Sequence, residues 1–137
     1  MGQDESNAGR QRDLSVLYEK VGGVLEAQGQ LSEALDAYEQ DLTIAKRLAE
    51  QDKSNWDRQR DLAISYQKVG DVFRAQGKLD QAIAHYTKAV QLDPDDSDAY
   101  FGRAFANQII ANFRGALRDF VRYLPTSANA WRRNRQM

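Results

Sequence analysis

Apolar residues recur along the chain at three- and four-residue spacing, in pairs of segments that meet at a glycine. Val69 and Val72 precede Gly77 in one such pair, and Ile83 and Val90 follow it. This spacing places the apolar side chains on one face of an α-helix. A glycine where the first helix must stop suits the left-handed conformation that commonly closes helices. The pattern therefore predicts a hairpin of two amphipathic helices.

The same pattern occurs 48 residues earlier in the chain. The stretch SNAGRQRDL at 6–14 returns as SNWDRQRDL at 54–62, and Tyr38 returns as Tyr86. Chance would not keep glycine, leucine, alanine and tyrosine positions in register over about 30 residues. The chain therefore contains an internal duplication of a helical hairpin.

The second copy carries a motif of aromatic and small residues at fixed spacing. It reads Tyr66-x2-Val69-Gly70-x2-Phe73, then Ala82-x3-Tyr86, then Pro94. This motif resembles the tetratricopeptide repeat (TPR) family. The resemblance implies an all-α fold, a right-handed superhelical array of helix hairpins, with a repeat domain over 8–125. We place its repeats at about 8–53, 54–96 and 97–125, followed by a partial capping helix and basic tail at 126–137.

The first repeat is longer than the family pattern. It exceeds the usual period of about 34 residues by 14, and apolar residues keep helical spacing through the added segment as far as Leu48. We therefore expect two long helices of about 20 residues, with Ser54 or Asn55 capping the second, an arrangement similar to the repeats of kinesin light chains. Ser32 and Asp80 are the expected N-caps of the helices that follow the turn glycines.

The third repeat keeps only part of the motif. Tyr100 follows Tyr66 by 34 residues and Ala116-x3-Phe120 is present, but Ala111 stands where the turn glycine should be. We still expect a third hairpin here, with a terminal helix around Trp131 covering the end of the array.

Composition removes most enzyme classes. The 137 residues include no cysteine and one histidine, His85, which excludes thiolate nucleophiles and zinc–thiolate sites. A glycine-rich phosphate loop is also missing. We predict a chain that is not an enzyme and takes no metal or cofactor. No apolar run approaches the roughly 18 residues of a membrane span, so we expect a cytoplasmic protein without a membrane partner.

The TPR resemblance implies that the first helix of each repeat lines a concave groove. The groove positions, read from the motif, are Glu19, Glu26, Gln67, Asp71, Arg74, Phe101, Phe105 and Gln108. One end is acidic and polar, and the other is aromatic. We therefore expect a protein or peptide partner with an apolar or basic segment. The basic residues and asparagine that clamp a C-terminal carboxylate in chaperone-binding members are absent from these positions.

Two interpretations of the aromatic end stay open. Phe101, Phe105 and Ile109 form a stripe at four-residue spacing, which either binds a partner or a second copy, or is covered by the terminal helix.

Charge is divided unevenly along the chain. Residues 1–96 carry 12 basic and 18 acidic side chains, whereas 97–137 carry 7 basic and 2 acidic ones. Contact between oppositely charged ends of two copies favours the alternative function, a self-assembling structural or oligomerisation module. Arg114, Arg118 and Arg122 share a helix face, but no interleaved aromatic motif accompanies them, so nucleic acid is not the expected partner.

Overall fold

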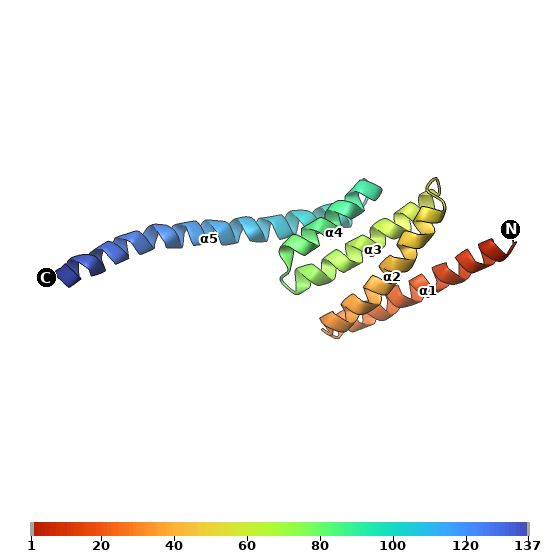
Figure 1. The fold of residues 1–137 in the computed structure, drawn as a ribbon, viewed down its shortest axis with the longest axis horizontal. Coiled ribbons are helices and arrows are strands. Elements are labelled where there is room, and N and C mark those ends of the chain that lie inside the picture. Colours follow the sequence, from red (N-terminus) through yellow and green to blue (C-terminus); the bar gives the residue numbers. More distant parts are fainter. Residues whose placement is uncertain (1, 137) are drawn as a thin grey trace. The chain divides into compact units, whose positions relative to one another are not determined.

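The computed structural model describes the backbone of residues 2–136 and the side chains of residues 7–122, in five α-helices (Figure 1). They are α1 (Gly2–Ala27), α2 (Leu31–Gln51), α3 (Trp56–Ala75), α4 (Leu79–Leu92) and α5 (Ser97–Gln136). The expected all-α fold is therefore confirmed over the described residues. The chain divides into two units, Met1–Ala106 and Asn107–Met137.

The first unit is built from two helix hairpins, α1 with α2 and α3 with α4. Consecutive helices pack on one another from α1 to α4 (Figure 1). Tyr38, Val69, Val72 and Tyr86 are the largest fully buried side chains of the core. The two expected hairpins are therefore present, and the apolar faces predicted from the spacing form their common core.

Both turn glycines have the predicted left-handed backbone. The φ angles of Gly29 and Gly77 are 77° and 78°. In each turn the following residue closes the helix through a backbone hydrogen bond, from Gln30 N to Leu25 O at 2.9 Å and from Lys78 N to Phe73 O at 2.8 Å. This is the Schellman closure, in which glycine avoids the steric cost that a β-carbon would carry.

The predicted N-caps are correct at one place and wrong at two. Asn55 accepts a hydrogen bond from the backbone N–H of Arg58 at 3.2 Å and caps α3. Ser32 and Asp80 are not caps, because α2 and α4 already begin at the residues before them. The Schellman turn delivers the chain directly into the next helix. The long helices are confirmed, since α2 has 21 residues and α3 has 20.

Glycines inside the first helices allow close contact with a buried ring. A β-carbon at Gly22 would lie 2.6 Å from the ring of Tyr38, and one at Gly70 would lie 3.0 Å from the ring of Tyr86. Close approach at these glycines is therefore the compensation for their low helix propensity. The approaching group is the motif tyrosine of the second helix in each hairpin.

The third repeat differs from the expected hairpin. α5 runs for 40 residues without interruption, so the turn expected at Ala111 does not occur, and the helix continues past residue 125, where the third repeat was expected to end. Alanine enters the left-handed conformation only at a steric cost and is the best helix former, so the helix continues where Gly29 and Gly77 end theirs. Trp131 and the basic tail lie outside the described side chains.

Within the described residues, no helix is both long and apolar enough to cross a membrane.

Candidate partner-binding groove

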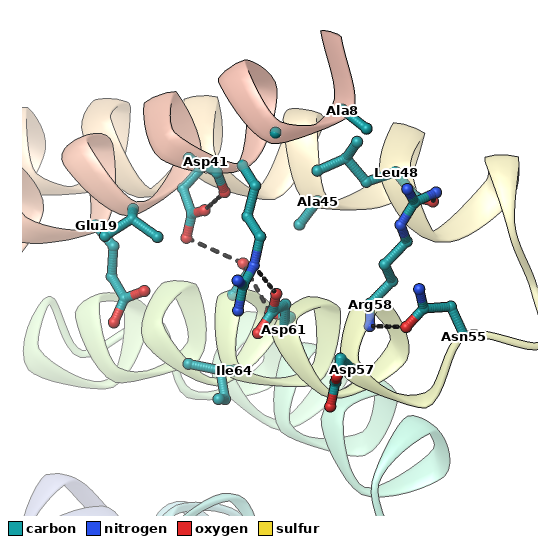
Figure 2. A pocket seen from close by; sticks show the side chains of 15 residues that line it. Ala8, Glu19, Asp41, Ala45, Leu48, Asn55, Asp57, Arg58, Asp61 and Ile64 are labelled. Carbon is teal, nitrogen blue, oxygen red and sulfur yellow. Dashed lines mark hydrogen bonds and ion pairs between the residues drawn. The ribbon is translucent and has the colours of Figure 1, made fainter. Parts of the chain in front are cut away.

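A pocket of about 370 Å³ opens between α1, α2 and α3 of the first unit (Figure 2). Its charged lining residues are four carboxylates and two guanidinium groups, Glu19, Asp41, Asp57, Asp61, Arg12 and Arg58. Asp41 and Asp61 enter the pocket from opposite sides (Figure 2). The excess of carboxylates makes the pocket favourable for a cationic group.

Asp41 is the most deeply buried charged residue of the pocket, with 2% of its surface exposed. It lies on the apolar face of α2, three residues after Tyr38 and four before Ala45. Its carboxylate accepts hydrogen bonds from the hydroxyl groups of Ser15 and Ser65, the latter at 2.9 Å. Helices α1 and α3 therefore each supply one donor to a carboxylate that α2 places between them.

Burial raises the pKa of Asp41 from 3.8 to about 6. Loss of hydration is the largest cause, because it disfavours the charged form. The two serine hydroxyls act in the opposite direction, and the negative charges of Glu19 and Asp61 add to the increase. The carboxylate is thus charged at neutral pH but held at a cost.

The rim of the pocket is partly neutralised by arginine. Arg12 Nε lies 3.1 Å from Asp61 Oδ2, with both side chains substantially exposed. Arg58 donates from Nη1 to the carbonyl oxygen of Leu48 at 3.1 Å. Because exposed ion pairs contribute little to stability, the pair between Arg12 and Asp61 can be broken at low cost when either side chain binds a ligand.

Glu19, predicted from the sequence as a groove residue, lines this pocket, whereas Asp41, Ser15 and Ser65 were not predicted. A signal for Asp41 exists in the sequence, since a carboxylate on the apolar face of a helix needs a partner. The serines have no equivalent signal. They face Asp41 only because of how α1 and α3 pack against α2.

Glu26, the second predicted groove residue on α1, is engaged with the core. The Tyr38 hydroxyl donates to Glu26 Oε1 at 2.9 Å. The pKa of Tyr38 is raised by its burial and by this carboxylate acceptor. Glu26 is half-buried and contributes to the contact between the two helices of the first hairpin.

Four of the predicted groove residues are brought together in a second cluster, formed by α3, α4 and the start of α5. Asp71 accepts a hydrogen bond from the Tyr86 hydroxyl, and Arg74 Nη2 lies 3.8 Å from Asp71 Oδ1. The Arg74 guanidinium lies 5.4 Å from the centre of the Phe105 ring. Phe101 and Phe105 stack with ring centres 6.5 Å apart.

The charges in this cluster balance one another. The pKa of Asp71 is raised by burial, while the Tyr86 hydroxyl and Arg74 act to lower it. Both aromatic rings stay open to solvent, with 70% of Phe101 and 50% of Phe105 exposed. The cluster therefore presents the Arg74 guanidinium and two aromatic rings, while the Asp71 carboxylate is already paired with Tyr86 and Arg74.

Two predicted groove residues lie elsewhere. Gln67 is buried, and its amide nitrogen, when turned toward Asp96, donates to that carboxylate at 3.2 Å. It therefore ties α3 to the turn before α5. Gln108 belongs to the second unit, where its amide donates to Asn112 Oδ1 at 2.9 Å.

Comparisons with known proteins match two parts of the chain to repeat families. The model described as "Tetratricopeptide repeat" matches residues 17–52, and the model described as "TPR repeat" matches residues 70–108. Among curated proteins, serine/threonine-protein phosphatase T of Aspergillus oryzae is 56% identical over 37 residues, which is 27% of this chain and 8% of the phosphatase.

A solved structure also aligns with the chain. It is the first TPR of Spaghetti (RPAP3) bound to the HSP90 peptide SRMEEVD, with 17% identity and a TM-score of 0.35. The alignment covers 72% of this chain and 94% of that one.

Proposed function

Because the chain belongs to the tetratricopeptide repeat family, whose fold generally serves protein interaction and not catalysis, we propose that it is an adaptor or scaffold module. Its first unit binds a peptide segment of a partner protein. The segment combines apolar side chains with lysine or arginine.

The observation that carries this proposal is the exposed aromatic pair. Phe101 and Phe105 keep 70% and 50% of their surface in contact with solvent. The two rings are stacked with an angle of 14° between their planes, and the Arg74 guanidinium lies 5.4 Å from the centre of the Phe105 ring. Large rigid rings that lose little conformational entropy on binding are the usual anchors of protein interfaces.

The pocket between α1, α2 and α3 supports the basic character of the partner. Four carboxylates and two guanidinium groups line it, so a lysine or arginine side chain entering it meets an excess of negative charge. Among the described side chains, Asp41 accepts hydrogen bonds from two hydroxyl donors, and a carboxylate can accept more than two hydrogen bonds. A cationic ligand would therefore add to the existing contacts of Asp41 without replacing them.

Selection from a displayed library of random peptides tests the proposal. The natural protein and a Phe101→Ala/Phe105→Ala variant are used as bait, with Trp56→Ala as the control, because Trp56 is an equally exposed aromatic residue outside the cluster. We expect the natural protein and the control to enrich peptides that contain lysine or arginine next to apolar residues. The double variant should lose them.

Circular dichroism of the double variant establishes that the helices are intact, since both rings are exposed and their removal leaves the core unchanged. Enrichment of the same peptides by the double variant would overturn the assignment of the aromatic pair. A selection that enriches no peptide on the natural protein would overturn the function itself.

A further inference from the structure

The third repeat contains both halves of a contact that the first two repeats make within themselves. In the first repeat the ring of Tyr38 packs on Gly22, and in the second the ring of Tyr86 packs on Gly70. The equivalent positions in the third repeat are Phe120 for the ring and Ala104 for the small residue. We call Ala104 and its surroundings on α5 the seat.

Phe120, which would supply the ring of this contact, is not packed against other described residues as Tyr38 and Tyr86 are. Phe120 is 57% exposed, in contrast with 1% for Tyr38 and 0% for Tyr86. Ala116, four residues earlier, is also exposed, although its equivalents in the first two repeats, Ala34 and Ala82, are fully buried. Phe113, Leu117 and Val121 extend the same exposed apolar face.

The seat around Ala104 is also not covered by an aromatic ring of the described residues. Ala104 is exposed, whereas the equivalent Gly70 is buried. Tyr100, one turn earlier on α5, keeps 42% of its surface exposed. Ala104 and Phe120 belong to one uninterrupted helix, in which side-chain neighbours are three or four residues apart.

We infer that two copies of this chain associate through α5, the face around Phe120 of each copy packing on the seat around Ala104 of the other. The two helices run antiparallel, as the two helices of each hairpin do. One contact then occurs twice, because a two-fold axis brings ring to seat and seat to ring. In this dimer the part of α5 around Phe120 in each copy takes the place that a second helix would have in the third repeat of the other copy.

Charge favours a second copy as the occupant. Residues 1–106 carry 13 basic and 19 acidic side chains, whereas residues 107–137 carry 6 basic and 1 acidic. A strongly basic helix therefore meets an acidic repeat unit when it packs on another copy. Opposite charges favour this encounter over the approach of two basic helices alone.

Light scattering coupled to size-exclusion chromatography tests the inference with two single variants, Ala104→Lys and Phe120→Glu. The natural protein should show twice the mass of the chain at high concentration. Each variant alone should show the mass of one chain, because both contacts of its dimer contain a buried unpaired charge. An equal mixture of the two variants should return to the mass of two chains, because a mixed dimer can form. In the mixed dimer one contact pairs the introduced lysine with the introduced glutamate, and the other contact is the natural one.

The mixing experiment separates exchange between copies from a hairpin within one copy. If α5 folds back on itself in a monomer, mixing leaves both masses unchanged, and the inference is overturned. A natural protein that stays monomeric at every concentration, or variants that dimerise as the natural protein does, overturn it too. Trp56→Ala serves as the control that keeps the dimer, because Trp56 is an exposed aromatic residue on α3, outside α5.

A milder change guards against loss of folding in the charged variants. Phe120→Ala keeps the helix and removes only the ring, so the dissociation constant should rise on the order of a hundredfold or more. An unchanged dissociation constant would contradict the assigned contact even if the natural protein is a dimer. Peptide binding by the first unit is a separate property, and its failure leaves this test unaffected.

Discussion

Asp41 offers a stability test whose sign and size follow from its burial. The carboxyl group is 2% exposed and its pKa is raised to about 6 in the folded protein. In the unfolded chain it returns to about 3.8. Below pH 4 the group is protonated in both states and imposes no penalty. Above pH 6 it is ionised in both states, and the folded state carries the cost of the buried charge.

The two pKa values set the magnitude. Each pKa unit corresponds to about 1.4 kcal/mol, so the difference between 3.8 and about 6 amounts to about 3 kcal/mol in the free energy of unfolding. The folded protein therefore loses this amount of stability as pH rises from 4 to 6. A carboxylate held in a salt bridge behaves in the opposite way and gains stability as pH rises. We therefore expect Asp41→Asn to become more stable, relative to the natural protein, as pH rises.

Urea unfolding followed by circular dichroism at pH 4, 5, 6 and 7.5 measures the effect. The difference between natural protein and Asp41→Asn isolates this group from all others that titrate, and Asp13→Asn provides the same substitution at an exposed position. The relative gain of Asp41→Asn should reach up to about 3 kcal/mol between pH 4 and 7.5. A difference that is constant with pH would refute the reasoning. A difference of the opposite sign would show that Ser15 and Ser65 outweigh the cost of burial.

Three further changes test the packing of the first unit by urea unfolding. Gly22→Ala should lower the free energy of unfolding by about 1 kcal/mol, because overpacking against the Tyr38 ring exceeds the gain in helix propensity. Gly115→Ala is the control and should not lower it, because its β-carbon would meet no described atom within 4 Å. Equal effects of the two substitutions would contradict the close contact at Gly22. Asn55→Ala should cost about 1 kcal/mol by removing the α3 cap, and no loss would mean that the cap is dispensable. Tyr86→Phe should cost about 1–2 kcal/mol by leaving Asp71 without its hydroxyl donor; an unchanged stability would show that water replaces it.

The way in which the predicted groove residues are arranged could be read from the sequence only in part. Asp71, Arg74, Phe101 and Phe105 were identified from the repeat motif and lie together in the structure. Gln67 was placed in the same groove but is buried against Asp96. Position in a repeat indicates which helix face a residue occupies, whereas its exposure depends on the side chains of the neighbouring turn.

The sequence by itself determined the two hairpins of this protein. Helical spacing, a duplicated motif and a glycine at each turn are local signals, and each acts within a few residues of the feature it specifies. Gly29 and Gly77 accordingly have the expected backbone, and Tyr38 and Tyr86 lie at the centre of the core.

Only the tertiary structure decided how the helices use their polar residues and where the third repeat ends. Asp41 became the centre of a pocket because α1 and α3 each direct a serine toward it, a contact between residues 24 and 26 positions apart in the chain. Ala111 did not end its helix, because a turn without glycine needs packing from a following helix to stabilise it, and in the described structure Phe120 remains exposed. Such contacts depend on the summed energies of distant residues, which no local pattern contains.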